Sequence, residues 1–132
     1  MKTDDISTIL DSLVDKDPRY AKAAYTFVQE SLEHLVKSLS KKEAGHVNGR
    51  QLMEGIRKYA LDQYGPMTLT LFNQWGIKRS EDFGEIVFNL IDVGIFGKTE
   101  SDHKTDFSAA YDFKTAFLEP FLPKNKKKKS TE

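Results

Sequence analysis

Residues 46–113 read HVNGRQLMEGIRKYALDQYGPMTLTLFNQWGIKRSEDFGEIVFNLIDVGIFGKTESDHKTDFSAAYDF and carry the strongest folding signals of the chain. Seven of its eight glycines and its only tryptophan lie in this stretch. Apolar residues recur there at intervals of three and four, which is typical of amphipathic helices, and capping residues, glycines and prolines separate the helices. The stretch contains no phosphate-binding loop, catalytic triad or metal-ligand spacing, so its motifs describe a fold and not a reaction.

The first helix of this stretch has clear start and stop signals. Asn48 followed by Gln51 is the pattern of a capping box, in which each side chain accepts a hydrogen bond from the other residue's backbone N–H. The helix is expected to end at Tyr64, because Gly65 can adopt a left-handed closing conformation and the proline after it prevents continuation. Gly55 costs about 1 kcal/mol relative to alanine inside a helix. Either another backbone packs closely there, which is the preferred interpretation, or the glycine is merely tolerated.

Two further helices follow. The second is expected over residues 67–75, closed by Gly76. Ser80 is predicted to cap the third, which carries acidic residues in its first turn, where they suit the helix dipole. This third helix should extend to about Val93 and end at Gly94.

The residues before the stretch predict two more helices. Asp4 can cap a short amphipathic helix that ends near Asp15, and Asp17 followed by a proline is a favourable helix start. Apolar residues at helical spacing over residues 20–39 predict a long helix with a continuous buried stripe. Residues 40–45 read as a polar connection.

The end of the stretch is less regular. Residues 95–113 have polar residues at the centre and apolar ones at both ends, which is compatible with a hairpin or an extended loop. Asp112 is predicted to cap a final helix from Phe113 to Leu118. Three apolar residues are expected to fold back on the body: Phe117, Phe121 and Leu122.

These elements predict a mainly α (α+β) fold: one compact helical domain over residues 1–123 with a C-terminal β-hairpin. Three helices followed by a hairpin give residues 48–113 a winged-helix-like arrangement, an analogy of fold that does not imply function. Residues 124–132 read as a disordered basic tail, since they contain five lysines and one glutamate. The formal net charge is zero, so the rest of the chain carries an excess of four negative charges.

Composition narrows the class of protein. The chain has no cysteine, which excludes disulfides, thiol nucleophiles and thiolate metal sites. No run approaches the roughly 20 apolar residues that span a bilayer, and the N-terminus has acids where a signal peptide needs a basic start. We therefore expect a cytoplasmic protein without a membrane partner.

The third helix carries an acidic stripe. Asp82, Glu85, Asn89 and Asp92 recur at helical spacing opposite its apolar face, and carboxylates there would oppose a polyanion in the major groove. The stripe is either a solvated face or a surface for a protein partner. The candidate binding surface consists of six residues: Arg50, Arg57, Asp82, Glu85, Asn89 and Asp92.

Other polar residues are weaker candidates. His46 and Arg50 stand at a helix N-terminus and could bind an anion, although the preferred interpretation is that His46 shapes the loop. His34 reads as a surface histidine. Glu100, Asp102, His103 and Asp106 do not match a calcium loop, so no metal, cofactor or catalytic residue is expected.

The aromatic content suggests where a partner could bind. Ten large rings between Tyr59 and Phe113 are mostly core, yet Phe88 or Phe96 is a candidate for an exposed anchor.

The chain resembles a family of short, functionally uncharacterised proteins of planctomycete and verrucomicrobial bacteria. The resemblance covers about residues 15–118 and rests on HVNGRQLMEGIRKYA, QYGPM, WGIKRSEDFGEIVFNLIDVGIFGKTESD, DF at residues 106–107 and YDF at residues 111–113. The resemblance implies a bacterial, cytoplasmic, single-domain protein, and it implies no substrate or catalytic residue.

Three functions follow in order of preference. The first is a non-enzymatic protein-interaction module that presents the acidic stripe and nearby aromatic side chains. The second is a nucleic-acid- or ribosome-associated protein that uses a winged-helix-like body and the lysines of residues 124–129. The third is an enzyme or small-ligand protein that uses the region of His46 and Arg50.

Overall fold

The computed structural model describes residues 3–44, 47–97, 107 and 110–122 of the chain. The described residues are mainly helical and contain no strand. The longer helices are α1 (Thr3–Lys16), α2 (Lys22–Ser38), α4 (Gly49–Tyr64) and α6 (Ser80–Asp92). The shorter elements are α3 (Lys41–Ala44), η1 (Gly65–Met67), α5 (Thr68–Gln74), the π-helix η3 (Lys114–Leu118) and the 3-10 helix η4 (Glu119–Phe121).

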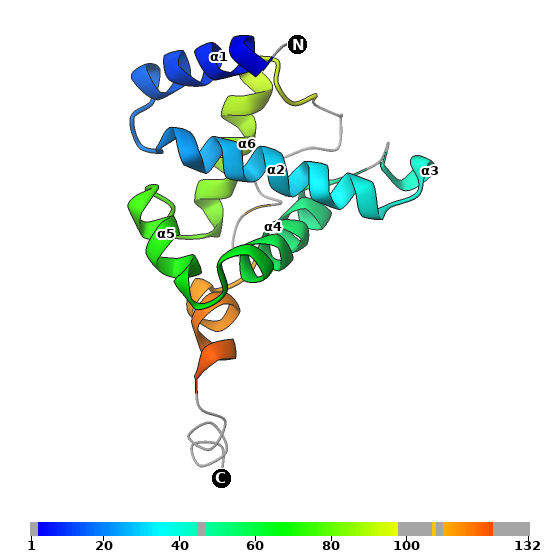
Figure 1. The fold of residues 1–132 in the computed structure, drawn as a ribbon, viewed down its shortest axis with the longest axis vertical. Coiled ribbons are helices and arrows are strands. Elements are labelled where there is room, and N and C mark those ends of the chain that lie inside the picture. The colour runs from blue at the N-terminus through cyan, green and yellow to red at the C-terminus, as the bar shows by residue number, and fades with distance from the viewer. Residues whose placement is uncertain (1–2, 45–46, 98–106, 108–109, 123–132) are drawn as a thin grey trace.

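Helix α2 is central to the packing, because it contacts α1, α4 and α6 (Figure 1). The first half of its predicted apolar stripe is confirmed, because Ala24, Phe27 and Val28 are buried, and Tyr25 is buried beside them. The second half of the stripe, from Leu32 to Leu39, is only partly buried. The buried residues of the first half join a single cluster of buried apolar side chains to which α1, α4, α5, α6 and η3 also contribute. The predicted mainly helical class is therefore correct.

The predicted signals of α4 are confirmed. The backbone N–H of Gln51 donates to Asn48 Oδ1 at 2.9 Å, and the Asn48 N–H donates to Gln51 Oε1 at 2.9 Å. Gly65 follows the helix with a φ of 49°. A Cβ at Gly55 would lie 3.3 Å from Leu35 Cδ2, so the glycine permits the close packing of α4 on α2 that the sequence predicts.

The predicted start of α2 at Asp17 is wrong. Residues 17–21 form a turn, and the helix begins at Lys22 with Ala21 as its N-cap. The Ala21 N–H instead donates to the carbonyl of Trp75 at 3.1 Å. Proline after Asp17 suits a turn as well as a helix start. Hydrogen bonds from Arg19 and from Asn89 of α6 occupy the Asp17 carboxylate.

Ser80 begins α6 but does not cap it. Its buried hydroxyl oxygen accepts the Ala110 N–H at 3.2 Å. The carboxylate of Asp82 takes over the capping role, since its Oδ2 accepts the backbone N–H groups of Lys78 at 2.8 Å and Arg79 at 3.2 Å. The predicted end of α6 is confirmed, because Gly94 follows it with a φ of 83°.

Two predictions near the polar connection and the C-terminus need correction. Residues 40–45 were expected to be a connection without secondary structure, but α3 lies within them. Asp112 does cap the last helical segment, since its Oδ2 accepts the Thr115 N–H at 3.0 Å. Phe117 is buried as expected, whereas Phe121 and Leu122 are exposed and do not fold back on the body.

Neither the hairpin nor the winged-helix-like arrangement is supported. The residues that the structure describes contain no strand, and most of the segment considered for the hairpin, residues 98–106, 108 and 109, lies outside them. Phe107 is described within this part of the chain: it is buried, and a Cβ at Gly84 of α6 would lie 3.1 Å from its Cβ.

Candidate functional site

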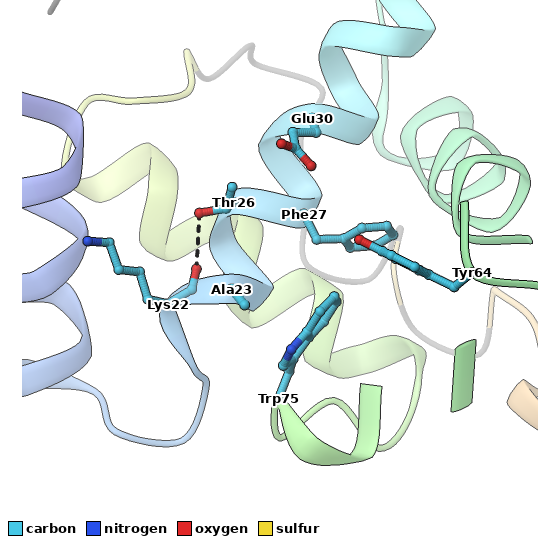
Figure 2. Close-up of a pocket in the computed structure, with 7 residues that line it drawn as sticks. All are labelled: Lys22, Ala23, Thr26, Phe27, Glu30, Tyr64 and Trp75. Atoms are coloured by element: carbon cyan, nitrogen blue, oxygen red, sulfur yellow. Dashed lines mark hydrogen bonds between the residues drawn. The ribbon is translucent and has the colours of Figure 1, made fainter. Parts of the chain in front are cut away.

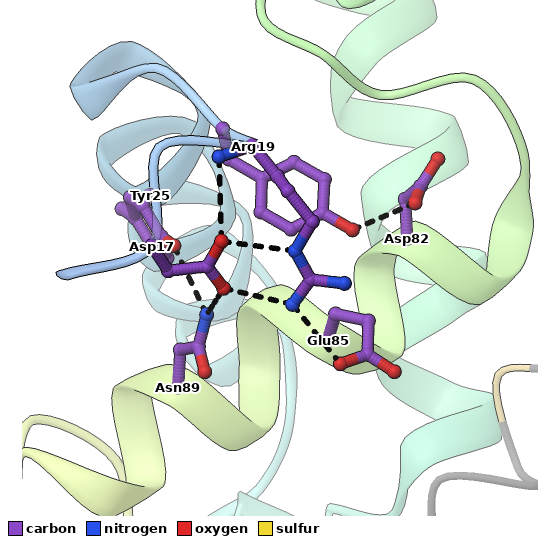
Figure 3. Close-up of polar contacts among 7 residues, drawn as sticks. Asp17, Arg19, Tyr25, Asp82, Glu85 and Asn89 are labelled. Carbon is purple, nitrogen blue, oxygen red and sulfur yellow. Dashed lines mark hydrogen bonds and ion pairs between the residues drawn. The ribbon is translucent and has the colours of Figure 1, made fainter. Parts of the chain in front are cut away.

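The polar face of α6 is turned toward the turn of residues 17–21 (Figure 3). Asn89 Nδ2 donates to Asp17 Oδ2 at 2.9 Å and to the Tyr25 hydroxyl at 3.1 Å. Arg19 donates to Asp17 from Nε at 2.9 Å and from Nη2 at 2.8 Å. The two contacts of Asn89 join α6 to the α1–α2 turn and to α2, across more than 60 residues of sequence.

Two further contacts extend this polar network along α6. The Tyr20 hydroxyl donates to Asp82 Oδ1 at 2.7 Å. Arg19 Nη2 pairs with Glu85 Oε1 at 3.3 Å (Figure 3). The Arg19 guanidinium also lies over the Tyr20 ring, with 5.1 Å from Cζ to the ring centroid. Each of three polar residues of α6 therefore has a partner within the chain: Asp82, Glu85 and Asn89.

The charges of the network are stabilised by these contacts. The hydrogen bonds from Arg19 hold the pKa of Asp17 well below its usual range, and the hydrogen bond to Asp17 raises the pKa of Arg19. Burial, followed by the contact with Asp82, raises the pKa of Tyr20. Burial also raises the pKa of Tyr25. Asp17 is therefore ionised and the two tyrosines are protonated around neutral pH.

The sequence predicts that the acidic stripe is either a solvated face or a surface for a protein partner, but three of its four members already have partners within the chain: Asp82, Glu85 and Asn89. All three are only half-exposed and are engaged by the α1–α2 turn. Asp92, the fourth member, is exposed at the end of α6. The sequence located the helix and its polar face correctly, but the face supports the fold.

The basic candidates lie elsewhere. Arg50 is exposed in the first turn of α4, and Arg57 pairs with Glu54 on the same helix. His46 lies outside the described residues, so the predicted anion site of His46 and Arg50 is not assembled by the residues that are described. The six residues of the candidate binding surface thus belong to separate regions, and their role in binding stays a prediction.

Basic residues gather instead around the start of α6. Arg19, Lys78 and Arg79 line a depression of about 560 Å³ that also contains Asp82. A depression with three basic residues at a helix N-terminus would suit an anion. Here, however, the Asp82 carboxylate already accepts two of the N–H groups of that N-terminus, so the chain supplies its own anion.

An apolar surface that the sequence did not indicate lies near the C-terminal end of the described chain. We call it the apolar end. Its four side chains are Met67, Leu118, Phe121 and Leu122, with exposed fractions of 54%, 37%, 43% and 42%. The surrounding elements adjoin, since η3 contacts both η1 and η4 below α4 and α5 in Figure 1. Phe88 and Phe96, the anchors proposed from the sequence, are only half-exposed.

A second missed feature is a pocket of about 390 Å³ between α2, the end of α4 and the end of α5 (Figure 2). We call it the aromatic pocket. It is lined by Lys22, Ala23, Thr26, Phe27, Glu30, Tyr64 and Trp75. Tyr64 and Trp75 are half-exposed and meet nearly at right angles, with ring centroids 5.9 Å apart and an interplanar angle of 80°.

The floor of the aromatic pocket is the buried ring of Phe27. Its centroid lies 5.8 Å from that of Tyr64 and 5.6 Å from that of Trp75. Burial, followed by the charge of Glu30, raises the pKa of Tyr64. A usable sequence signal was that both wall residues stand at helix ends directly before a glycine, where the core stripe stops and a ring can face outward.

Two groups of predictions concern metals and membranes. The described residues contain no group of three or more side chains that could hold a metal ion, and the predicted cluster of Glu100, Asp102, His103 and Asp106 lies outside them. Among the described helices, none is long and apolar enough to cross a membrane.

Comparison with known proteins adds no relative. No protein-family model, no curated protein and no solved structure matches the chain. The family resemblance inferred from the sequence therefore stays a prediction.

Proposed function

We propose that this chain is a non-enzymatic protein-interaction module whose partner docks on the apolar end. The observation that supports this proposal is the exposure of four large apolar side chains, each 37% to 54% accessible, on adjoining elements. Single exposed apolar residues are ordinary on protein surfaces, but a contiguous group of large ones is typical of a binding surface.

The apolar end is suited to anchor a partner. Removing one of these exposed side chains from water contributes about 1 kcal/mol. Four side chains are too few for a whole interface of standard size, so polar contacts around them must supply the rest. The chain continues from Leu122 into the segment with five lysines. This charge favours a partner segment with apolar anchors flanked by acidic residues, which it would attract during encounter.

In-cell cross-linking tests this proposal and identifies the partner. A photo-reactive amino acid is placed at Phe121 in the full-length chain, in the source organism, and the matched control carries it at Thr70, an exposed polar position on α5. We expect one discrete cross-linked species from position 121 and none from position 70. The double substitution Phe121→Glu plus Leu122→Glu, probed from Met67, should remove that species.

The control for charge and folding is the pair Thr70→Glu plus Gln74→Glu, which adds two acids at exposed positions of α5. This variant should retain the cross-link. Equal labelling from positions 121 and 70, or no labelling from either, would reject the apolar end as the docking surface. A species with twice the mass of the chain would replace the partner protein by a second copy.

Association with nucleic acid or the ribosome remains the alternative function. It depends on the lysines of residues 124–129, which lie outside the described residues. Deleting residues 124–132 should then abolish retention on RNA or ribosomes, and the retention by the full chain should weaken steeply with added salt. Retention that survives the deletion would reject this function.

A further inference from the structure

The aromatic pocket has the chemistry of a cation site. The faces of tryptophan and tyrosine rings attract cations through their quadrupole, and tryptophan does so most strongly. Trp75 and Tyr64 form two half-exposed walls over the ring of Phe27, and Glu30 lies at the rim one helical turn beyond it (Figure 2). None of the described residues forms an ion pair with Glu30.

The one basic residue of the aromatic pocket does not oppose a cation there. The Lys22 side chain points away from the rings toward α1 (Figure 2). Its Nζ donates to Ser7 Oγ at 2.6 Å and pairs with Asp11 Oδ1 at 2.9 Å. The charge that remains beside the aromatic walls is that of Glu30. After burial, this charge is the second cause of the raised pKa values of Tyr64 and Tyr59.

We infer that the aromatic pocket binds the guanidinium group of an arginine side chain presented by a partner protein. A guanidinium is flat, stacks on an aromatic face and still has edge N–H groups free to pair with a carboxylate. The rings of Tyr64 and Trp75 provide the aromatic faces, and Glu30 provides the carboxylate. A quaternary ammonium has no N–H group for Glu30, and it is favoured where rings surround it on several sides.

A partner protein fits better than a free small molecule, because the pocket is an open depression with Ala23, Thr26 and Glu30 exposed at its edge. Ligand pockets for free small molecules usually bury most of the ligand surface. A partner would cover the open side itself. This inference goes beyond the proposed function, since it concerns another surface and does not require the apolar end.

Intrinsic fluorescence tests the inference directly, because Trp75 is the only tryptophan of the chain. The full-length protein is titrated with N-acetyl-arginine amide, with its lysine and citrulline counterparts, and with tetramethylammonium. We expect saturable binding of the arginine probe that weakens with salt, weaker binding of lysine and none of citrulline, which is neutral. Binding of citrulline equal to that of arginine, or tightest binding of tetramethylammonium, would overturn the inference.

Matched variants locate the site. Glu30→Gln should weaken arginine binding about 2- to 5-fold, as expected for one exposed ion pair. Asp92→Asn removes the same charge from an exposed position outside the pocket and should change nothing. Tyr64→Leu should weaken binding about 2- to 5-fold. Tyr64→Phe keeps the ring and should bind as the wild type does.

Two outcomes separate this inference from the proposed function. The variant Phe121→Glu plus Leu122→Glu should titrate with the arginine probe as the wild type does, even though its partner cross-link is lost. If Glu30→Gln and Asp92→Asn bind the probe equally well, the pocket is not an arginine site, and the cross-linking result at the apolar end is unaffected. Circular dichroism of each variant confirms that the helices persist.

Discussion

The polar face of α6 and the aromatic pocket each differ from the environment that their residue types suggest. Polar residues usually lie on a solvated surface, yet three of them on α6 are hydrogen-bonded to the α1–α2 turn: Asp82, Glu85 and Asn89. Tyr64 and Trp75 have the composition of a core, yet both are half-exposed beside a carboxylate. A residue type therefore predicts its environment only when no distant segment of the chain competes for it.

Gly76 connects these two regions, and its substitution should have the largest effect. A Cβ at this position would lie 2.1 Å from the carbonyl oxygen of Arg19, and the φ of 87° is unfavourable for other residues. Gly76→Ala should lower the free energy of unfolding by about 3 kcal/mol or more, because the turn of residues 17–21 must move. Urea denaturation measures this loss.

Gly94→Ala is the control for the backbone conformation. Gly94 has a similar φ of 83°, but nothing lies within 4 Å of a Cβ there. Its substitution should cost about 1 kcal/mol from conformation alone. Equal losses for the two variants would show that the contact with Arg19 does not hold the turn and the pocket together.

The bond between Asn89 and Asp17 should have the next largest effect. Asn89→Ala leaves one acceptor position of the largely buried Asp17 carboxylate without its donor and removes the bond to Tyr25. We expect a loss of about 1 to 3 kcal/mol in the free energy of unfolding. A double-mutant cycle with Asp17→Ala should show a coupling energy above 0.5 kcal/mol. Additive losses would mean that the polar face of α6 is a solvated surface after all.

The low pKa of Asp17 predicts how stability depends on pH. The folded state holds this carboxyl ionised at pH values where the unfolded chain, with an ordinary pKa of about 4, already binds a proton. The contribution of Asp17 is therefore fully present above about pH 4 and is lost progressively as the pH falls further. The stability difference between the wild type and Asp17→Asn, followed by denaturant midpoints, should shrink below that pH. A constant difference would contradict the network.

Lys22 should have the smallest effect, although it lines the aromatic pocket. Its ion pair with Asp11 is largely exposed, and such pairs contribute between 0 and about 1 kcal/mol. Lys22→Met should therefore change the free energy of unfolding by less than about 1 kcal/mol and leave arginine binding intact. Tighter arginine binding by this variant would show that the ammonium does reach the pocket.

Local signals in the sequence were sufficient for much of the fold. The capping box of Asn48 and Gln51 was predictable because both partners lie within one turn, and the apolar stripe of α2 was predictable from its spacing. Gly55 was interpreted correctly for a similar reason: a costly residue inside a helix implies a neighbour, which is Leu35.

The errors arose where a side chain had both a local and a distant partner. Asp17 and Ser80 are both suitable helix caps. Asp17 instead accepts hydrogen bonds from Arg19 and Asn89, and Ser80 accepts one from the backbone N–H of Ala110. The candidate binding surface on α6 could not be judged from the sequence for the same reason, because its distant partners were unknown. Periodicity shows that Asp82, Glu85 and Asn89 share a face, and it does not show that Tyr20 and Arg19 lie against that face.

The protonated tyrosine hydroxyls of the chain have a consequence in alkaline solution. The sequence contains five tyrosines, and burial raises the pKa of each one. In base, the unfolded chain would release phenolic protons that the folded chain retains, so proton loss favours unfolding above about pH 10. During an alkaline titration, the ultraviolet absorbance of phenolate should therefore rise at a higher pH than for free tyrosine. It should rise cooperatively, because the tyrosines ionise as the protein unfolds.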